Sequence, residues 1–203
     1  ARRVTGRCFA GLILAAGAST RMPGRSKLAR AWSDTTVLGA VLRNAAAANL
    51  DPLFVVCSAS RPDLESEGRL TVVRVPGPDA GNAASLAAGL SAMPEGPIVV
   101  LLGDEPGVRP ADIRALVGAW DPSVGDMARL RYADRPGHPV LLGSSARVRA
   151  QQLTGELAVW DTLVAEGFEA VEITVEGSAP IDVDSPSDLR RARRGQPADG
   201  GRG

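Results

Sequence analysis

The sequence lacks several features that often mark a protein class. Its 203 residues include 23 basic and 23 acidic side chains, so the formal net charge at pH 7 is zero. Nothing in this balance favours nucleic acid or an anionic membrane as a partner. The hydrophobic share of 44% and the charged share of 23% are ordinary for a globular chain and indicate neither disorder nor a membrane span. We therefore expect a small-molecule ligand.

Cysteine and histidine are scarce as well. Cys8 and Cys57 are the only thiols, and no CxxC or Cys/His spacing typical of a zinc site is present. Both cysteines stand in apolar surroundings, so we expect both to be buried. His138 is the single histidine. A structural zinc site is not expected.

Lysine is the scarcest basic residue, because 22 of the 23 basic residues are arginine and only Lys27 is lysine. In so biased a composition, we expect arginine at any basic position that tolerates it, so the lysine indicates that position 27 needs a compact ammonium on a flexible stem. A point charge on a phosphate fits that need. One lysine left by chance on a surface loop is the alternative.

The length suits one domain with a core that needs no disulfides, and we expect a single domain over residues 1–194. Residues 195–203 contain almost nothing apolar, so we expect a disordered tail. Three arginines before the apolar run 8–18 imitate a secretory signal, but that run passes directly into a Gly-rich loop and resembles a first core strand. We therefore expect a cytoplasmic protein.

Short apolar runs without period-2 alternation are typical of strands that are buried on both faces. The first half has four, at Phe9–Ala15, Leu53–Cys57, Leu70–Val75 and Ile98–Leu102. Helical stretches accompany them at Val37–Ala48, Ala80–Met93 and Ala111–Trp120. This alternation predicts an α/β, Rossmann-like, doubly wound and mostly parallel sheet with helices on both faces.

The sequence pattern of the second half of the chain predicts further strands, some of which could run antiparallel. The strands are expected at Met127–Tyr132, His138–Leu142 and Ala170–Val175, with a helix at about Leu157–Val164. Ser185-Pro186-Ser187-Asp188 offers an N-cap, a first-turn proline and an acidic third residue, which predicts a closing helix that ends by Arg194.

A Gly-rich loop follows the first predicted strand, at the edge where open α/β sheets bind ligands. It runs from Gly17 to Lys27, and its small residues allow backbone N–H groups to approach phosphate oxygens. It matches neither the Walker A pattern nor GxGxxG. Its cations Arg21, Arg25 and Lys27 suit a polyanion such as a triphosphate. A solvated basic loop is the alternative.

Acidic residues provide a candidate metal site. Asp104 directly follows a buried strand, with Gly103 permitting a turn. Carboxylate and phosphate oxygens bind Mg²⁺ together, so Asp104 is a natural ligand facing the Lys27 loop, unless it only caps its own turn. Asp182 and Asp184 lie on one face of an extended segment. We favour Asp182 as the second ligand, since Asp184 could instead cap the closing helix.

Four blocks in this order resemble the MobA/MocA-like nucleotidyltransferases, over roughly residues 9–192. They are Leu14–Met22, Lys27-Leu28, Gly103–Pro106 and Asp182–Leu189. The resemblance implies a fold like that of nucleotide-diphospho-sugar transferases, and the block order and compact length favour molybdopterin nucleotide synthesis. The block Gly81–Leu90 is similar to the cytidylyltransferase type, in which its Gly and Ser read the base; the guanylyltransferase type usually shows Gly-Pro-Leu-Ala-Gly.

The resemblance also implies roles for individual residues. Catalysis would fall to Arg21, Lys27 and Asp104, and magnesium to Asp104 and Asp182. Nucleotide contacts would come from Leu14, Ala15, Ala16, Gly17, Ser19, Arg21, Lys27, Gly81, Ser85 and Asp104. Acceptor contacts would come from His138, Pro139 and Glu156. Two positions depart from the family pattern: Pro23, where Gly is more frequent, and Glu105, where Gln is more frequent.

The implied reaction is Mg²⁺-dependent transfer of CMP from CTP to a phosphorylated acceptor of pterin type, with release of pyrophosphate and possible delivery to a molybdoenzyme. The alternatives are a GTP-dependent guanylyltransferase or another sugar-phosphate nucleotidyltransferase, and a non-catalytic cofactor carrier. An oxidoreductase on a Rossmann sheet is disfavoured because its glycine fingerprint is missing. His138 could be a general base or a polar residue of the cleft.

Overall fold

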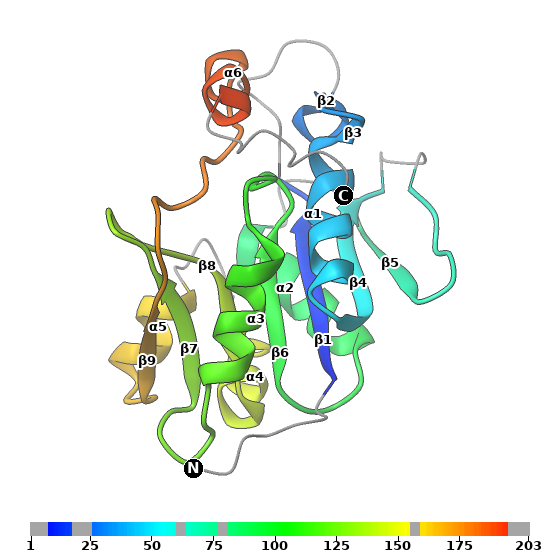
Figure 1. Ribbon diagram of the computed structural model, residues 1–203. Helices are drawn as coiled ribbons and strands as arrows, with labels where there is room; N and C mark the ends of the chain where they lie inside the picture. The colour runs from blue at the N-terminus through cyan, green and yellow to red at the C-terminus, as the bar shows by residue number, and fades with distance from the viewer. Residues whose placement is uncertain (1–7, 18–25, 60–63, 77–80, 155–158, 195–203) are drawn as a thin grey trace.

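The computed structural model of the chain describes residues 8–17, 26–59, 64–76, 81–154 and 159–194. Its main feature is a seven-stranded sheet in the order β5-β4-β1-β6-β8-β7-β9 (Figure 1). The strands are β1 Phe9–Ala15, β4 Leu50–Ser58, β5 Leu70–Val75, β6 Ile98–Leu102, β7 Met127–Arg131, β8 Pro136–Leu142 and β9 Ala170–Thr174. Only β8 runs opposite to its neighbours. The mostly parallel sheet and its one antiparallel strand confirm the predicted fold class.

The two central strands explain the continuous apolar runs of the sequence. Successive side chains of a strand point to opposite faces, and on β1 Ile13 packs into one hydrophobic cluster while Leu12 packs into the other. On β6, Val99 and Val100 divide in the same way. Because both faces are covered, alternation of apolar and polar residues would have placed polar groups in the core.

Helices cover both faces of the sheet (Figure 1). On one face α1 Val37–Ala47 and α3 Pro110–Ala119 pack against each other and the sheet. The other face carries α2 Gly81–Ala92, α4 Ser144–Ala150 and α5 Val159–Ala165. The doubly wound arrangement is therefore confirmed.

The closing helix α6, Pro186–Arg194, begins where the sequence predicts. Its capping box is reciprocal: the Asp188 backbone N–H donates to Ser185 Oγ at 3.2 Å, and the Ser185 backbone N–H donates to Asp188 Oδ2 at 2.9 Å. Ser185 and Asp188 thus cap this helix, which leaves the carboxylate of Asp184 available for another contact.

Some elements were not predicted. The sequence pattern gave no sign of α4, which is seven residues long and carries too few apolar residues to show a helical period. The short 3-10 helix η1, Lys27–Ala29, and the hairpin of β2 Ala31–Trp32 and β3 Thr35–Thr36 were missed for the same reason of length. The expectation for one cysteine was wrong: Cys57 is buried within β4, but Cys8 is exposed just before β1.

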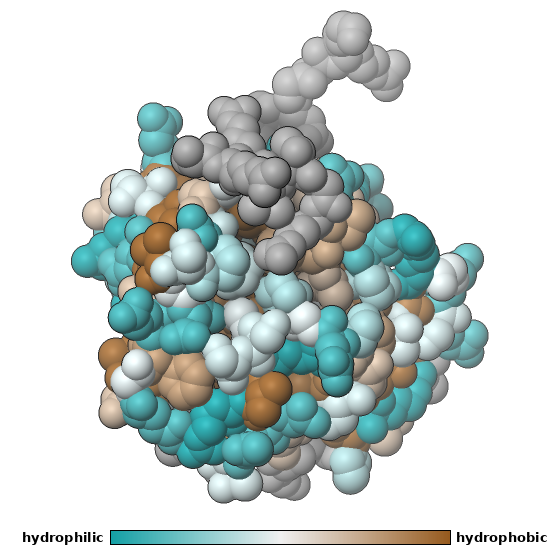
Figure 2. Space-filling model, turned by 90° about the horizontal axis from the view of Figure 1, so that it is seen from below, coloured by the Kyte–Doolittle hydropathy of each residue, from teal (hydrophilic) through white to brown (hydrophobic). Residues whose placement is uncertain are grey.

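One face of the molecule carries no large hydrophobic patch on the part that the described residues cover (Figure 2). Seen from below in the view of Figure 1, hydrophobic residues stand in small groups among hydrophilic ones (Figure 2). Among the described residues, no helix has the length and apolar character needed to cross a bilayer.

The strand order determines where a ligand can bind. From β1 the chain proceeds outward to β4 and β5, and it then returns to the other side of β1 to form β6. Open α/β sheets bind ligands at such a switch point, beyond the carboxyl ends of the two diverging strands. Gly17 follows β1 and Asp104 follows β6, so the predicted site residues meet at this edge.

Candidate active site

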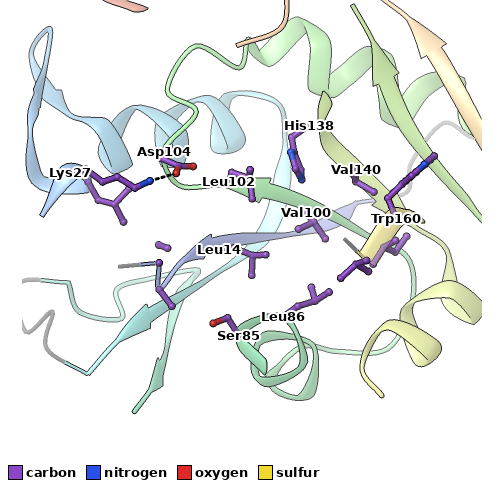
Figure 3. A pocket seen from close by; sticks show the side chains of 16 residues that line it. Leu14, Lys27, Ser85, Leu86, Val100, Leu102, Asp104, His138, Val140 and Trp160 are labelled. Carbon is purple, nitrogen blue, oxygen red and sulfur yellow. Dashed lines mark hydrogen bonds and ion pairs between the residues drawn. The ribbon is translucent and has the colours of Figure 1, made fainter. Parts of the chain in front are cut away.

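A cavity of about 400 Å³ opens beside this edge of the sheet (Figure 3). Small-molecule sites in proteins commonly have volumes of this order. Eight of the residues that the sequence assigned to the site line it: Leu14, Ala15, Ala16, Gly17, Lys27, Ser85, Asp104 and His138. The fold therefore brings together side chains that are more than 100 positions apart.

Asp104 is positioned by the backbone of Gly103. The Gly103 N–H donates to the carbonyl oxygen of Leu14 at 2.9 Å, which closes the end of β6 against β1. A Cβ at position 103 would lie 3.1 Å from both that oxygen and the Cβ of Ala15, so a side chain there would force the two strand ends apart. The close approach directs the Asp104 side chain into the cavity (Figure 3).

Lys27 lies at the start of η1, next to Leu28, which is buried in the core. Its ammonium contacts two carboxylates: Nζ donates to Asp104 Oδ2 at 2.5 Å and to Asp184 Oδ1 at 2.7 Å. Burial alone would lower the pKa of Lys27, but hydrogen bonds and attraction from the two carboxylates outweigh burial and raise it. Lys27 is therefore charged at neutral pH, as a phosphate ligand must be.

Asp184 reaches this site because its segment is tied to the loop after β6. The Val183 N–H donates to the carbonyl oxygen of Asp104 at 2.9 Å, and the Val183 side chain is fully buried. Asp184, on one side of that anchor, contacts Lys27. Asp182 and Asp184 both line a second, polar cavity with Arg135. The structure thus places Asp184, rather than Asp182, with Asp104 around Lys27.

Glu105 occupies an unusual place between the two cavities. It is 2% exposed, and its Oε2 has no hydrogen-bond partner among the described residues. Burial and the neighbouring Asp182 carboxylate raise its pKa well above the usual range. Its Oε1 lies 3.8 Å from His138 Nδ1. The sequence analysis noted Glu105 only as a departure from the family pattern, because nothing in a Gly-Asp-Glu-Pro string tells which carboxylate turns inward.

His138, on β8, lines the cavity with 31% of its side chain exposed. Surrounding atoms nevertheless desolvate the ring, and this burial lowers the pKa of His138 to about 4, with Asp182 and Asp104 partly opposing it. The carbonyl oxygen of His138 accepts a hydrogen bond from the Tyr132 hydroxyl at 2.9 Å. His138 is therefore neutral at pH 7, and its ring can donate or accept a hydrogen bond but carries no charge.

The other predicted residues divide into three groups. Ser85 is a buried residue of α2 that lines the cavity, and Gly81 is the first residue of that helix. Pro139 is buried within β8 and is not among the residues that line the cavity. Ser19, Arg21 and Glu156 lie outside the described residues.

The sequence analysis missed one whole wall of the cavity. Val140 and Leu142 of β8, Val159 and Trp160 of α5, and Val100 of β6 line it together. No motif marks these residues, since an apolar side chain in a strand or helix reads as core. They differ from core residues only in that one side of each faces the cavity, and the sequence does not reveal this.

The chain is similar to known proteins over most of its length. Residues 11–169 match the family described as the MobA-like NTP transferase domain. Rv0371c from Mycobacterium tuberculosis H37Rv is 32% identical with a TM-score of 0.83, and the match covers 94% of this chain and 100% of that one. A second structure of Rv0371c, a complex with manganese, is 30% identical with a TM-score of 0.76 over the same shares, 94% and 100%.

Two further similarities are more limited. The structure of CMP:2-keto-3-deoxy-manno-octonic acid synthetase complexed with CTP is 16% identical, with a TM-score of 0.75 and coverage of 93% of this chain and 98% of that one, and it bears on the fold alone. The bifunctional protein GlmU of Zymomonas mobilis is 34% identical over 140 residues, or 66% of this chain. That match spans only 29% of the length of GlmU, so it concerns one part of that protein.

Proposed function

The chain belongs to the MobA-like NTP transferase family, and on this basis we propose that it transfers CMP from CTP to a phosphorylated acceptor of pterin type and releases pyrophosphate. The observation that carries the proposal is the ammonium of Lys27 between Asp104 and Asp184, at 2.5 and 2.7 Å, at the switch point of the sheet. A fixed cation beside two carboxylates suits phosphoryl chemistry, in which positioning and charge neutralisation do most of the work.

In the proposed reaction an oxygen of the acceptor phosphate attacks the α-phosphorus of CTP. The bond between that phosphorus and the oxygen bridging to the β-phosphate breaks, and pyrophosphate leaves with the electron pair. The acceptor phosphate is already ionised, so no general base is required, which agrees with a neutral His138. The ammonium of Lys27 stabilises the negative charge that develops on the α-phosphoryl group and on the departing pyrophosphate. Arg21, which lies outside the described residues, is proposed to assist it.

The donor set fits a divalent cation. The described residues contain no group of three or more potential metal-ligating His, Cys, Asp or Glu side chains, but the carboxylates of Asp104 and Asp184 both lie beside the Lys27 ammonium. Mg²⁺ commonly takes one or two carboxylates and completes its shell with substrate phosphates and water. When bound, the cation would neutralise charge on the phosphate oxygens. The manganese complex of Rv0371c supports a divalent ion, and we propose Mg²⁺.

The choice of CTP rests on the block from Gly81 to Leu90, which is similar to that of cytidylyltransferases, and on Ser85 of this block lining the cavity. A guanylyltransferase remains the rival within the class, because no described contact reads the base. The pterin acceptor rests on the resemblance of the four sequence blocks, and a molybdoenzyme is the proposed recipient of the product. A non-catalytic carrier would have no need of a fixed cation beside two carboxylates.

The test is pyrophosphate release with Mg²⁺ and each of CTP, GTP, ATP and UTP, with and without a molybdopterin-type acceptor. We expect release that depends on the acceptor and is fastest with CTP. Release with GTP would assign the chain to the guanylyl branch, and no release with any nucleotide would refute catalysis on this acceptor and favour the carrier.

A further inference from the structure

The cavity has two ends that differ in chemistry. Lys27 and Asp104 form one end, and they are the only charged side chains among the described residues that line it. Leu86, Val100, Val140, Leu142, Val159 and Trp160 line another part of it, and we call these six residues the apolar end. Figure 3 shows Trp160 across the cavity from the Lys27–Asp104 pair. A ligand that fills the cavity therefore meets charged groups at one end and apolar side chains at the other.

The indole ring of Trp160 is held in place by Arg129. The guanidinium of Arg129 lies over its indole ring, 4.5 Å from the centroid. Arg129 is itself fixed, since its Nε and one terminal nitrogen donate to Glu172 Oε1 at 2.9 and 2.6 Å, and the two residues are register partners on β7 and β9. Arg129 therefore covers one face of the ring, and Trp160 also lines the cavity. The ring is preorganised before any ligand arrives.

The nucleotide and the acceptor cannot both use this end. In the proposed function Ser85 and the residues after β1 hold the nucleotide, on the side of β1 and α2. The apolar end lies mainly on β8 and α5, which contribute Val140, Leu142, Val159 and Trp160. It is therefore the place left for the body of the acceptor, whose phosphate must reach the α-phosphorus beside Lys27.

We propose that the apolar end binds a planar aromatic ring of the acceptor packed against Trp160, which makes Trp160 the residue that selects ring acceptors over sugar or polyol phosphates. This inference rests on the proposed function, and it adds the residue that recognises the ring of the acceptor. A polyol ring placed here would lose hydrogen bonds to water without gaining partners from six apolar side chains, which is costly. An aromatic ring loses less and gains contact with the indole.

The experiment measures binding without nucleotide, so that it does not depend on catalysis. The full chain is titrated calorimetrically with a pterin monophosphate and, separately, with inositol 1-phosphate, a non-aromatic ring that also carries one phosphate. The variants are Trp160→Phe, which keeps an aromatic face, and Trp160→Leu, which keeps only apolar volume. Val148→Ala, at an exposed position of α4 away from the cavity, is the control and should bind as the wild type does.

We expect the pterin phosphate to bind the wild type and Trp160→Phe within about threefold and Trp160→Leu about tenfold more weakly. Inositol 1-phosphate should bind at least tenfold more weakly than the pterin and equally to all variants. Equal pterin affinity in Trp160→Leu, preference for inositol 1-phosphate, or no pterin binding overturns the inference. Pyrophosphate assays separate the two ideas: pterin binding through Trp160 without transfer refutes the proposed function alone, whereas transfer with an unchanged KM in Trp160→Leu refutes only the ring site.

Discussion

At the scale of single residues, the environment of Lys27 could be predicted only in part. The rarity of lysine identified position 27, and the Gly-rich loop indicated a phosphate ligand. The sequence could not show that Asp184, 157 positions away, meets the same ammonium, because that contact depends on the hydrogen bond from the Val183 N–H to Asp104. Side chains joined by tertiary backbone contacts leave no local pattern.

His138 provides a direct test of how the site is desolvated. The chain has one histidine, so its imidazole gives unambiguous NMR signals. Because burial lowers its pKa to about 4, we expect the folded protein to titrate there and the chain in urea to titrate near 6.5. Between about pH 4 and pH 6.5, His138 is protonated in the unfolded chain but neutral in the folded chain. Titration of His138 therefore leaves the free energy of unfolding at its full value above about pH 6.5 and decreases it as the pH falls toward 4.

A folded-state value near 6.5 would show that the ring is solvated and that the cavity wall is open. Asp182→Asn serves as a check on the electrostatics. Its carboxylate opposes the effect of burial, so its removal should lower the histidine pKa further.

The second metal ligand can be decided by comparing two neighbouring carboxylates. Asp184 contacts Lys27 beside Asp104, and Asp182, which the sequence favoured, lines the polar cavity together with Asp184. We expect Asp184→Asn to weaken Mn²⁺ binding about tenfold or more, as measured by electron paramagnetic resonance of free Mn²⁺, because one of two carboxylate ligands is lost. Asp182→Asn should change it less than threefold. The reverse order would restore the assignment from sequence.

At the scale of elements, the block from Gly81 to Leu90 has a structural reason beyond base reading. A Cβ on Gly89 would lie 2.6 Å from Leu12 Cδ1 and 2.7 Å from Val56 Cγ2, so α2 packs closely on β1 and β4. The sequence predicted this helix correctly, yet it gave no hint that the glycine sets the distance to the sheet. Helix periodicity shows which face is buried, but it does not show how closely that face approaches its neighbour.

A matched pair of substitutions tests this packing. Gly89→Ala should destabilise the protein by about 1–3 kcal/mol, because the added methyl group overlaps two buried side chains. Gly118→Ala, near the end of α3 with no atom within 4 Å of the new Cβ, should stabilise it by about 0.5–1 kcal/mol. Urea denaturation measures both changes. Equal effects of the two substitutions would mean that α2 does not lie against β1 and β4 as described.

At the scale of the whole molecule, the sheet order follows from features that the sequence shows well. Buried runs alternate with helices, and this alternation predicted a doubly wound fold. The direction of β8 could not be derived, because pairing direction depends on how the chain returns after β7 and not on the composition of the strand. That residues 1–194 form a single domain stays a prediction. The apolar end of the cavity could not be foreseen, since its residues are indistinguishable from core residues in the sequence.

The central claim is that nucleotidyl transfer takes place where Lys27 meets Asp104 and Asp184, and the turnover of Lys27→Ala tests it most directly. We expect kcat to fall about 100-fold or more, because a preorganised positive charge at the reacting phosphate is removed, while the thermal unfolding midpoint stays close to that of the wild type. Arg43→Ala, at an exposed position of α1 where the guanidinium pairs with Asp34 at 2.9 Å, should keep wild-type turnover. Wild-type turnover in Lys27→Ala would contradict the account.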